Sequence, residues 1–226
     1  MLQTATLEFF RELRQNNHKE WFDQNRSRYE KVKKDYHQLV GRLLLQMQKH
    51  DRDLSMLQVK DCIFRINRDI RFSKDKSPYK THLGIILTPF GRKLEFAGYY
   101  LHLDEHEGSF AGGGCYMPQA DALRKIRREV SDFYEDLAEV LHAPGFVKTY
   151  GDLDRDEGMV LSRPPKGFDA NDPAIEYLKL KSFTATTPLD ASWLSDPDGA
   201  EQAASLLLEL KPFLDFLNRG LRADNL

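Results

Sequence analysis

The stretch LEFAGYYLHLDEHEGSFAGGGCYM, residues 94–117, decides the fold that we expect for this chain of 226 residues. Residues 94–103 alternate, so that even-numbered side chains face one way and odd-numbered ones the other, which is the period of a β-strand. The polar DEHEG sequence at 104–108 then predicts a hairpin loop into a second strand over 109–117. Because so short a connection leaves no room for a crossover helix, the sheet is expected to be mainly antiparallel.

Further strands are predicted on both sides of this hairpin. Residues 61–67 alternate in the same way, and residues 83–88 form a β-branched apolar run that Pro89 closes. Residues 181–187 alternate again, far along the chain. The pattern therefore predicts strands between 61 and 117, followed by one more near the C-terminal end.

The remaining regular pattern is helical. Apolar residues recur at helical spacing in an N-terminal region, a middle region and a C-terminal region. The expected helices cover residues 7–13, 17–47, 118–141 and 199–217. The second should begin with a capping box from Asn17 to Glu20 and break near residues 25–27. The last should kink at Pro212. Helices around a mainly antiparallel sheet make an α+β fold. No linker or repeat marks a boundary, so we predict one domain over residues 1–226.

Composition restricts the class of protein. The chain is 41% hydrophobic and 30% charged, which is typical of a globular domain. No run approaches the roughly 18 apolar residues of a membrane helix, and the N-terminal apolar stretch contains acids and arginine, unlike a signal peptide. Two cysteines do not make a disulfide framework, so a reducing, cytoplasmic location is expected, with no membrane partner.

The densest feature is RINRDIRFSKDKSPYKTH, residues 65–82, which we call the basic segment. The residues from Lys60 to Lys93 include nine Lys and Arg and three Asp, which gives a charge of +6 in a chain whose total charge is −2. So many cations repel unless an anion or acidic side chains offset them. Guanidinium forks and ammonium groups suit phosphate and carboxylate. The predicted anion-binding residues are Arg65, Arg68, Arg71, Lys74, Lys76 and Lys80.

An alternative interpretation needs no ligand. Asp69 and Asp75 lie inside the basic segment and could pair with its arginines and lysines. The segment would then be a solvated ion-pair loop, whose individual pairs contribute only about 0–1 kcal/mol. Because three acids cannot neutralise nine bases, anion binding is the preferred interpretation.

The motif CIFRINRDIRFSKDKSPYKTH, followed by GRK, GYYLHL, GSFAGGGCYMP and RPPKGFD, resembles a widespread family of uncharacterised proteins known as a domain of unknown function. The likeness runs from FRELRQNNHKEWF near the N-terminus to LKPFLDFLN near the C-terminus. One departure is the DEHEG sequence, where the family is expected to have a glycine-rich turn. The resemblance implies a single-domain, cytoplasmic protein and brings no activity with it.

Three side-chain groups are candidates for chemistry. Tyr79 and His82 lie at the end of the basic segment, where nearby cations would lower the pKa of each side chain. The simpler interpretations are that Tyr79 is a packed aromatic residue and that His82 is hydrogen-bonded to the backbone. His102, Asp104 and His106 have strand-alternate spacing, which would place three metal ligands on one face. Asp104 and His106 also lie in the predicted hairpin loop, where charged side chains are usual without a metal. The sequence leaves open whether the protein is an enzyme, and no cofactor is predicted.

Two further features have simple structural explanations. The glycine run at 112–114 lacks the Gly-Lys-Ser/Thr ending of a phosphate-binding loop, so a bulge or a close approach of another segment is the preferred interpretation. Cys62 and Cys115 lie on predicted strands and are expected to be buried.

These observations support three functions. The first is a basic site for a phosphorylated or anionic small ligand, with or without catalysis. The second is a nucleic-acid or protein interaction module that uses the basic segment, with stacking by Phe72, Tyr79, Tyr99 and Tyr100. Near-neutral total charge disfavours a generic nucleic-acid binder. The third is a metal-dependent enzyme at the strand-alternate histidines. The oligomeric state stays open.

Overall fold

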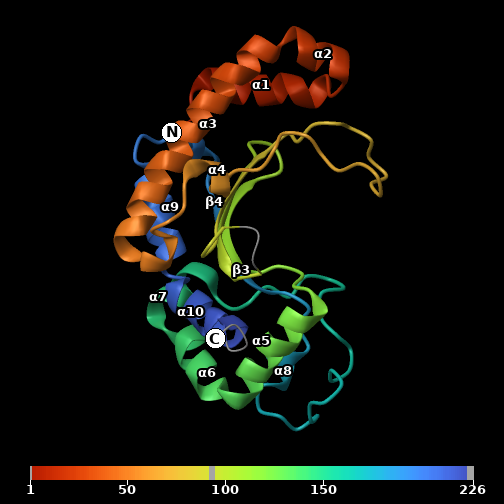
Figure 1. The fold of residues 1–226 in the computed structure, drawn as a ribbon, viewed down its shortest axis with the longest axis vertical. Helices are drawn as coiled ribbons and strands as arrows, with labels where there is room; N and C mark the ends of the chain where they lie inside the picture. The colour runs from red at the N-terminus through yellow and green to blue at the C-terminus, as the bar shows by residue number, and fades with distance from the viewer. Residues whose placement is uncertain (1, 92–94, 223–226) are drawn as a thin grey trace. The chain divides into compact units, whose positions relative to one another are not determined.

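The computed structural model describes residues 2–91 and 95–222 (Figure 1). The α-helices are α1 (Thr4–Gln15), α2 (Lys19–Gln24), α3 (Arg26–His50), α4 (Val59–Cys62), α5 (Ala120–Asp132), α6 (Tyr134–His142), α7 (Pro144–Tyr150), α8 (Ile175–Leu178), α9 (Gly199–Leu208) and α10 (Lys211–Arg222). Short 3₁₀ turns are η1 (Arg52–Leu54) and η2 (Ala191–Ser195). The strands are β1 (Leu83–Leu87), β2 (Gly98–Leu103), β3 (Ser109–Cys115) and β4 (Phe183–Leu189).

The strands form one antiparallel sheet in the order β1-β2-β3-β4. The hairpin predicted over 104–108 joins β2 to β3, and the α+β class is confirmed. The odd-numbered side chains of β2 are buried, whereas Tyr100 and His102 are half-buried. One face of this strand therefore belongs to the core, and the other face is open enough to hold a functional site.

The strand predicted over 61–67 is wrong. Residues up to Cys62 form α4, because Gln58 and Asp61 cap it reciprocally and complete a helical turn. Beyond it only isolated bridges join Ile63 to Ile85 and Asn67 to Tyr79. Alternation in the sequence indicates which side chains face inward. It does not show whether a neighbouring strand pairs with the segment over enough residues to form a ladder. The strand expected from Leu94 begins at Gly98, and Leu94 lies outside the described residues.

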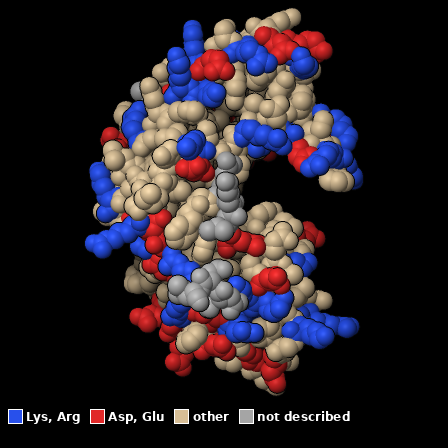
Figure 2. Space-filling view, viewed as in Figure 1, with Lys and Arg blue, Asp and Glu red and all other residues tan. Residues whose placement is uncertain are grey.

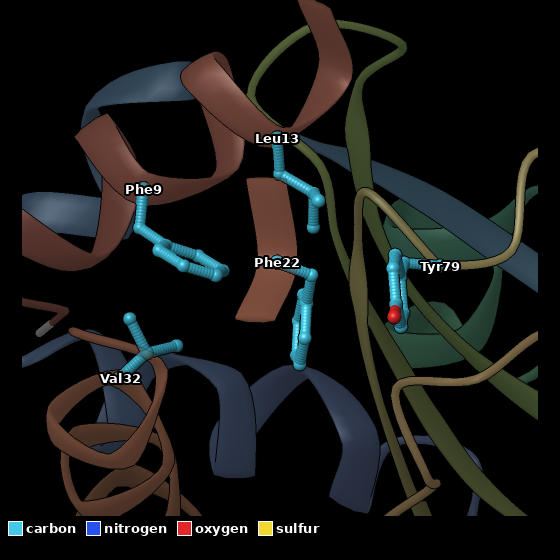
Figure 3. Close-up of a cluster of buried hydrophobic side chains, with 5 residues drawn as sticks. All are labelled: Phe9, Leu13, Phe22, Val32 and Tyr79. Carbon is cyan, nitrogen blue, oxygen red and sulfur yellow. The ribbon is translucent and has the colours of Figure 1, made fainter. Parts of the chain in front are cut away.

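Contacts along the chain group its residues into two compact units, so the single domain predicted over 1–226 stays a prediction. The first unit comprises Met1–Leu87, Tyr100–Phe110 and Pro188–Ala204. Within it α1 packs against α3, and a buried cluster forms from Phe9, Leu13, Phe22, Val32 and Tyr79 (Figure 3).

The N-terminal helices of this unit break where the sequence predicted. Helix α2 ends at Gln24 and α3 begins at Arg26, on either side of Asn25. The predicted cap is wrong by one residue, because the Nδ1 atom of His18 accepts the amide hydrogen of Trp21. Asn17 instead holds both backbone groups of Tyr79, with Oδ1 accepting from its N–H at 3.0 Å and Nδ2 donating to its carbonyl at 2.9 Å. This amide fixes the end of the basic segment to the helices.

The second unit comprises Thr88–Tyr99, Ala111–Thr187 and Ser205–Leu226. In it α10 packs against α5 and α6. The C-terminal helix predicted over 199–217 is two helices, with Pro212 in the first turn of α10, where its missing N–H costs no helical hydrogen bond. The middle helix is likewise divided, at Phe133.

The glycine run of β3 lets neighbouring backbones approach closely. A Cβ atom on Gly112 would lie 2.7 Å from the carbonyl oxygen of Ala185, and one on Gly113 would lie 2.7 Å from that of Gly98. The close-packing interpretation of this run therefore agrees with the structure. Within the described residues, no helix has the length and apolar character needed to cross a bilayer.

Candidate functional site

Three side chains from neighbouring strands converge in the first unit. His82 directly precedes β1, His102 lies on the half-buried face of β2, and Asp104 directly follows β2. Each can offer one ligand atom, and these atoms all lie within 4.8 Å of one another. Because β1 and β2 are paired, residues that are 20 positions apart in the chain meet across the sheet.

This group differs from the one that the spacing predicted. His102 and Asp104 are in it, but the third member is His82 rather than His106. The backbone N–H of His106 donates to Asp104 Oδ1 at 2.8 Å, and its side chain is exposed in the hairpin loop. The chain turns immediately after Asp104, so strand alternation does not continue to residue 106. The sequence had marked His82 only as a separate candidate at the start of a strand.

Aromatic rings surround the two imidazoles. The ring centroids of His82 and His102 are 4.5 Å apart, and Phe110 stacks on His102 at 4.9 Å. Burial lowers the pKa of His82 to about 4, with the charge of His102 adding to the effect, and burial also lowers the pKa of His102. Both imidazoles are therefore neutral at pH 7, the state in which a ring nitrogen can bind a metal.

A tyrosine orients His102. The hydroxyl of Tyr100 lies 3.1 Å from His102 Nδ1. If the imidazole proton is on Nδ1, it donates to this hydroxyl and leaves the Nε2 lone pair free. Burial raises the pKa of Tyr100, so the phenol stays protonated and neutral. Such a partner on the far nitrogen is what fixes the tautomer of a metal-binding histidine.

The carboxylate of Asp104 is buried and held from several sides. Its side chain is 2% exposed, and Arg14 Nη2 donates to both oxygens at 3.1 and 3.0 Å. The backbone N–H groups of His106 and Glu107 donate to Oδ1 at 2.8 and 3.1 Å. Oδ2 accepts from Arg14 alone among the described residues, so it keeps capacity for a further ligand.

The substitution Arg14→Ala is expected to destabilise the protein by about 2 kcal/mol, because it leaves a buried carboxylate without its counter-charge. The matched control is Arg11→Ala on the same helix. Arg11 pairs with Glu105, and these side chains are 57% and 33% exposed, so solvent screens the pair and its loss should cost much less than that of Arg14. Urea unfolding followed by circular dichroism measures both; equal losses would contradict a special role for the buried pair.

Three of the six cations of the basic segment have partners inside it. Arg68 forms an ion pair with Asp75, Arg71 binds Asp69 through two hydrogen bonds of 2.9 and 2.7 Å, and Lys76 Nζ donates to the Ile70 carbonyl at 3.0 Å. Lys80 Nζ lies 5.0 Å from the ring centroid of Phe64. These four cations have four different partners, and the pairing of the two arginines with aspartates agrees with the ion-pair interpretation.

The other two predicted anion-binding residues are exposed. Arg65 and Lys74 make no ion pair or side-chain hydrogen bond with the residues described over 2–91 and 95–222. Figure 1 shows the segment as a long excursion, orange to yellow, before β1, and Figure 2 shows Lys and Arg gathered along it with acids between them. Arg92 and Lys93, which the sequence count included, lie outside the described residues.

The aromatic residues near the basic segment do not form a shared stacking surface. Tyr79 is 7% exposed and stacks on Phe22 with centroids 4.0 Å apart, as in Figure 3, which favours packing over a reactive phenol. Tyr99 is buried and Tyr100 half-buried. Of the four rings considered from the sequence, only Phe72 is fully on the surface, at 94% exposure.

Neither cysteine is a candidate nucleophile. Cys62 and Cys115 are both buried and form no disulfide with each other, and their burial was expected from the sequence. Burial raises the pKa of the Cys115 thiol to about 12, so almost none of the reactive thiolate is present at neutral pH.

Comparison with known proteins places the chain in one family. A family model described as "Conserved hypothetical protein (DUF2461)" matches residues 5–216. This confirms the resemblance to a domain of unknown function that the motifs indicated. No curated protein and no solved structure matches the chain.

Proposed function

Because the chain belongs to that family of conserved hypothetical proteins, whose description names no reaction, we propose its function from the site itself. We propose a metal-dependent enzyme that acts on a phosphorylated or otherwise anionic substrate at His82, His102 and Asp104. The observation that carries this proposal is the convergence of two imidazoles and one carboxylate within 4.8 Å. Two nitrogens and one oxygen are a ligand set of catalytic zinc sites and of non-haem iron sites, which keep positions open for water and substrate.

The surroundings support a metal rather than a simple core packing of histidines. The Tyr100 hydroxyl contacts Nδ1 of His102, and Arg14 with two backbone amides orients Asp104. Metal ligands typically have such outer partners, since these fix the direction of each lone pair. A divalent ion held there would polarise a substrate oxygen and lower the pKa of a bound water.

The charges near the site suit an anionic substrate. Lys80 precedes His82 by two residues, and its charge helps to lower the pKa of His82, so its field reaches the site. The exposed Arg65 belongs to the same basic segment. We propose a cytoplasmic location, because two cysteines that form no disulfide agree with a reducing compartment.

Metal binding is the direct test. After stripping with EDTA, the full chain is expected to bind one Zn²⁺, measured by isothermal titration calorimetry, with Mn²⁺ and Fe²⁺ as further arms. His82→Ala and His102→Ala should each weaken binding by at least about tenfold, as the loss of a direct ligand does. His106→Ala is the matched control and should leave affinity unchanged, because His106 is outside the group.

Hydrolysis then tests the enzyme. Phosphate monoesters, phosphodiesters and carboxylate esters of p-nitrophenol are offered with each metal, and any turnover should disappear in EDTA and in His102→Ala. The absence of stoichiometric metal binding, or an equal loss in His106→Ala, would contradict the proposal.

A further inference from the structure

An exposed phenylalanine lies in the basic segment. Phe72 is 94% exposed, so the faces of its ring are open to a partner. The guanidinium carbon of its neighbour Arg71 lies 5.8 Å from the ring centroid. An aromatic face beside a cation is the arrangement on which an unpaired nucleobase stacks.

The charges around Phe72 are regularly spaced. Arg65, Arg68, Arg71 and Lys74 follow one another at intervals of three residues. Asp75 and Asp69 hold Arg68 and Arg71 in place, whereas Arg65 and Lys74 are exposed. The segment therefore offers several cations in succession along the chain, which matches a row of phosphates better than one compact anion.

We propose that the basic segment binds single-stranded nucleic acid, with one base stacked on Phe72 and phosphates held by Arg65 and Lys74. We further infer that this polymer is the substrate class of the His82, His102 and Asp104 site. The second part rests on the proposed function, and the first does not. Cleavage is hydrolysis of a phosphodiester: a water oxygen bonds to phosphorus, the bond to the leaving sugar oxygen breaks, and that oxygen takes up a proton.

The binding segment and the metal ligands are connected directly. Phe72 precedes His82 by ten residues, so at most about 36 Å of chain separates them. Lys76 and Lys80 lie along this connection. An oligonucleotide of several residues held at Phe72 can therefore extend toward the three ligands.

Single strands fit better than the other polyanionic partners. Duplex binders are usually basic over a whole face, whereas this chain has a total charge of −2. Membrane attachment needs a broad apolar face or several anchors, and Phe72 is the one large apolar side chain with more than half its surface exposed in the described basic segment. A single ring is sufficient for one stacked base, which contributes about 1–3 kcal/mol.

Binding is tested without metal, so that it does not depend on the catalytic proposal. Fluorescence anisotropy of labelled dT and U 12-mers with the full chain in EDTA should show saturable binding that weakens as salt rises. Phe72→Ala should raise Kd about tenfold. Arg65→Ala combined with Lys74→Ala should lower the slope of log affinity against log salt by about 1.4, since each contact with a single strand contributes about 0.7.

The charge-matched control is Lys31→Ala combined with Lys34→Ala, two exposed lysines of α3, which should change neither Kd nor slope. Met56→Ala controls for the loss of an exposed apolar side chain, as Met56 is 84% exposed. No saturable binding, unchanged affinity in Phe72→Ala, or sedimentation with phosphatidylserine vesicles but no oligonucleotide binding would each overturn the inference.

Adding Zn²⁺ or Mn²⁺ separates the two proposals. If the wild type shortens the 12-mer and His102→Ala binds it without shortening it, both the proposed enzyme and the proposed binding of single strands are supported. Oligonucleotide binding with no cleavage under any metal would overturn the substrate assignment and count against the proposed enzyme, while the binding surface stands. Zinc binding at the histidines without oligonucleotide binding would overturn this inference alone.

Discussion

Gly114→Ala is expected to lower the free energy of unfolding by more than about 4 kcal/mol, enough to prevent folding of many domains. Gly114 has a φ of +128°, a region that other residues rarely adopt. A Cβ atom there would lie 2.0 Å from the carbonyl oxygen of Phe183. That oxygen belongs to the backbone of β4, so relief requires the separation of two paired strands.

The matched control is Gly108→Ala at the other end of the same hairpin. Gly108 also has a positive φ, +99°, but nothing lies within 4 Å of an added Cβ. Only the backbone strain remains, and it should cost about 1–3 kcal/mol. Soluble yield and urea midpoints by circular dichroism compare the two; similar losses would mean that conformation, rather than the close approach of β4, accounts for the effect.

Phe22→Ala should destabilise the protein by about 3–5 kcal/mol, because it removes a large ring from a packed cluster and leaves a cavity. Phe22 is 3% exposed and stacks on Tyr79 (Figure 3), and its ring centroid lies 5.0 Å from that of Tyr29. Since Tyr79 is at the end of the basic segment, the same change should make that segment more sensitive to trypsin. Urea unfolding and limited proteolysis measure the two effects.

Phe72→Ala is the matched control, with the same atoms removed at 94% exposure. It should change stability by less than about 0.5 kcal/mol. If Phe72→Ala were as destabilising as Phe22→Ala, its ring would be part of the packing, and its effect on oligonucleotide binding could not be assigned to stacking.

Local patterns predicted much of the fold. Alternation over residues 94–103 and the DEHEG turn indicated the hairpin of β2 and β3, and the length of the helical span over 17–47 indicated the break near residues 25–27 that the structure has at Asn25. The prediction over 61–67 was wrong because alternation is equally compatible with a helical turn and an extended stretch that pairs at two points only. Strand pairing depends on a neighbour, which no local pattern contains.

The candidate site was half predicted. Spacing marked His102 and Asp104 correctly as neighbours, since they lie two residues apart at the end of one strand. It chose His106 as their partner because strand alternation was continued to residue 106, although the predicted loop already begins at residue 104. Arg14 and Asn17, which hold Asp104 and Tyr79, were missed, as each acts across more than 60 residues of chain.

Sequence was sufficient for the α+β class, the hairpin, the family motifs and the concentration of positive charge in residues 65–82, because each depends on residues close together in the chain. Folding decided which charges are neutralised: Arg68 and Arg71 pair with Asp75 and Asp69, while Arg65 and Lys74 are exposed. It also brought His82 to His102, since the pairing of β1 with β2 sets which side chains meet across the sheet.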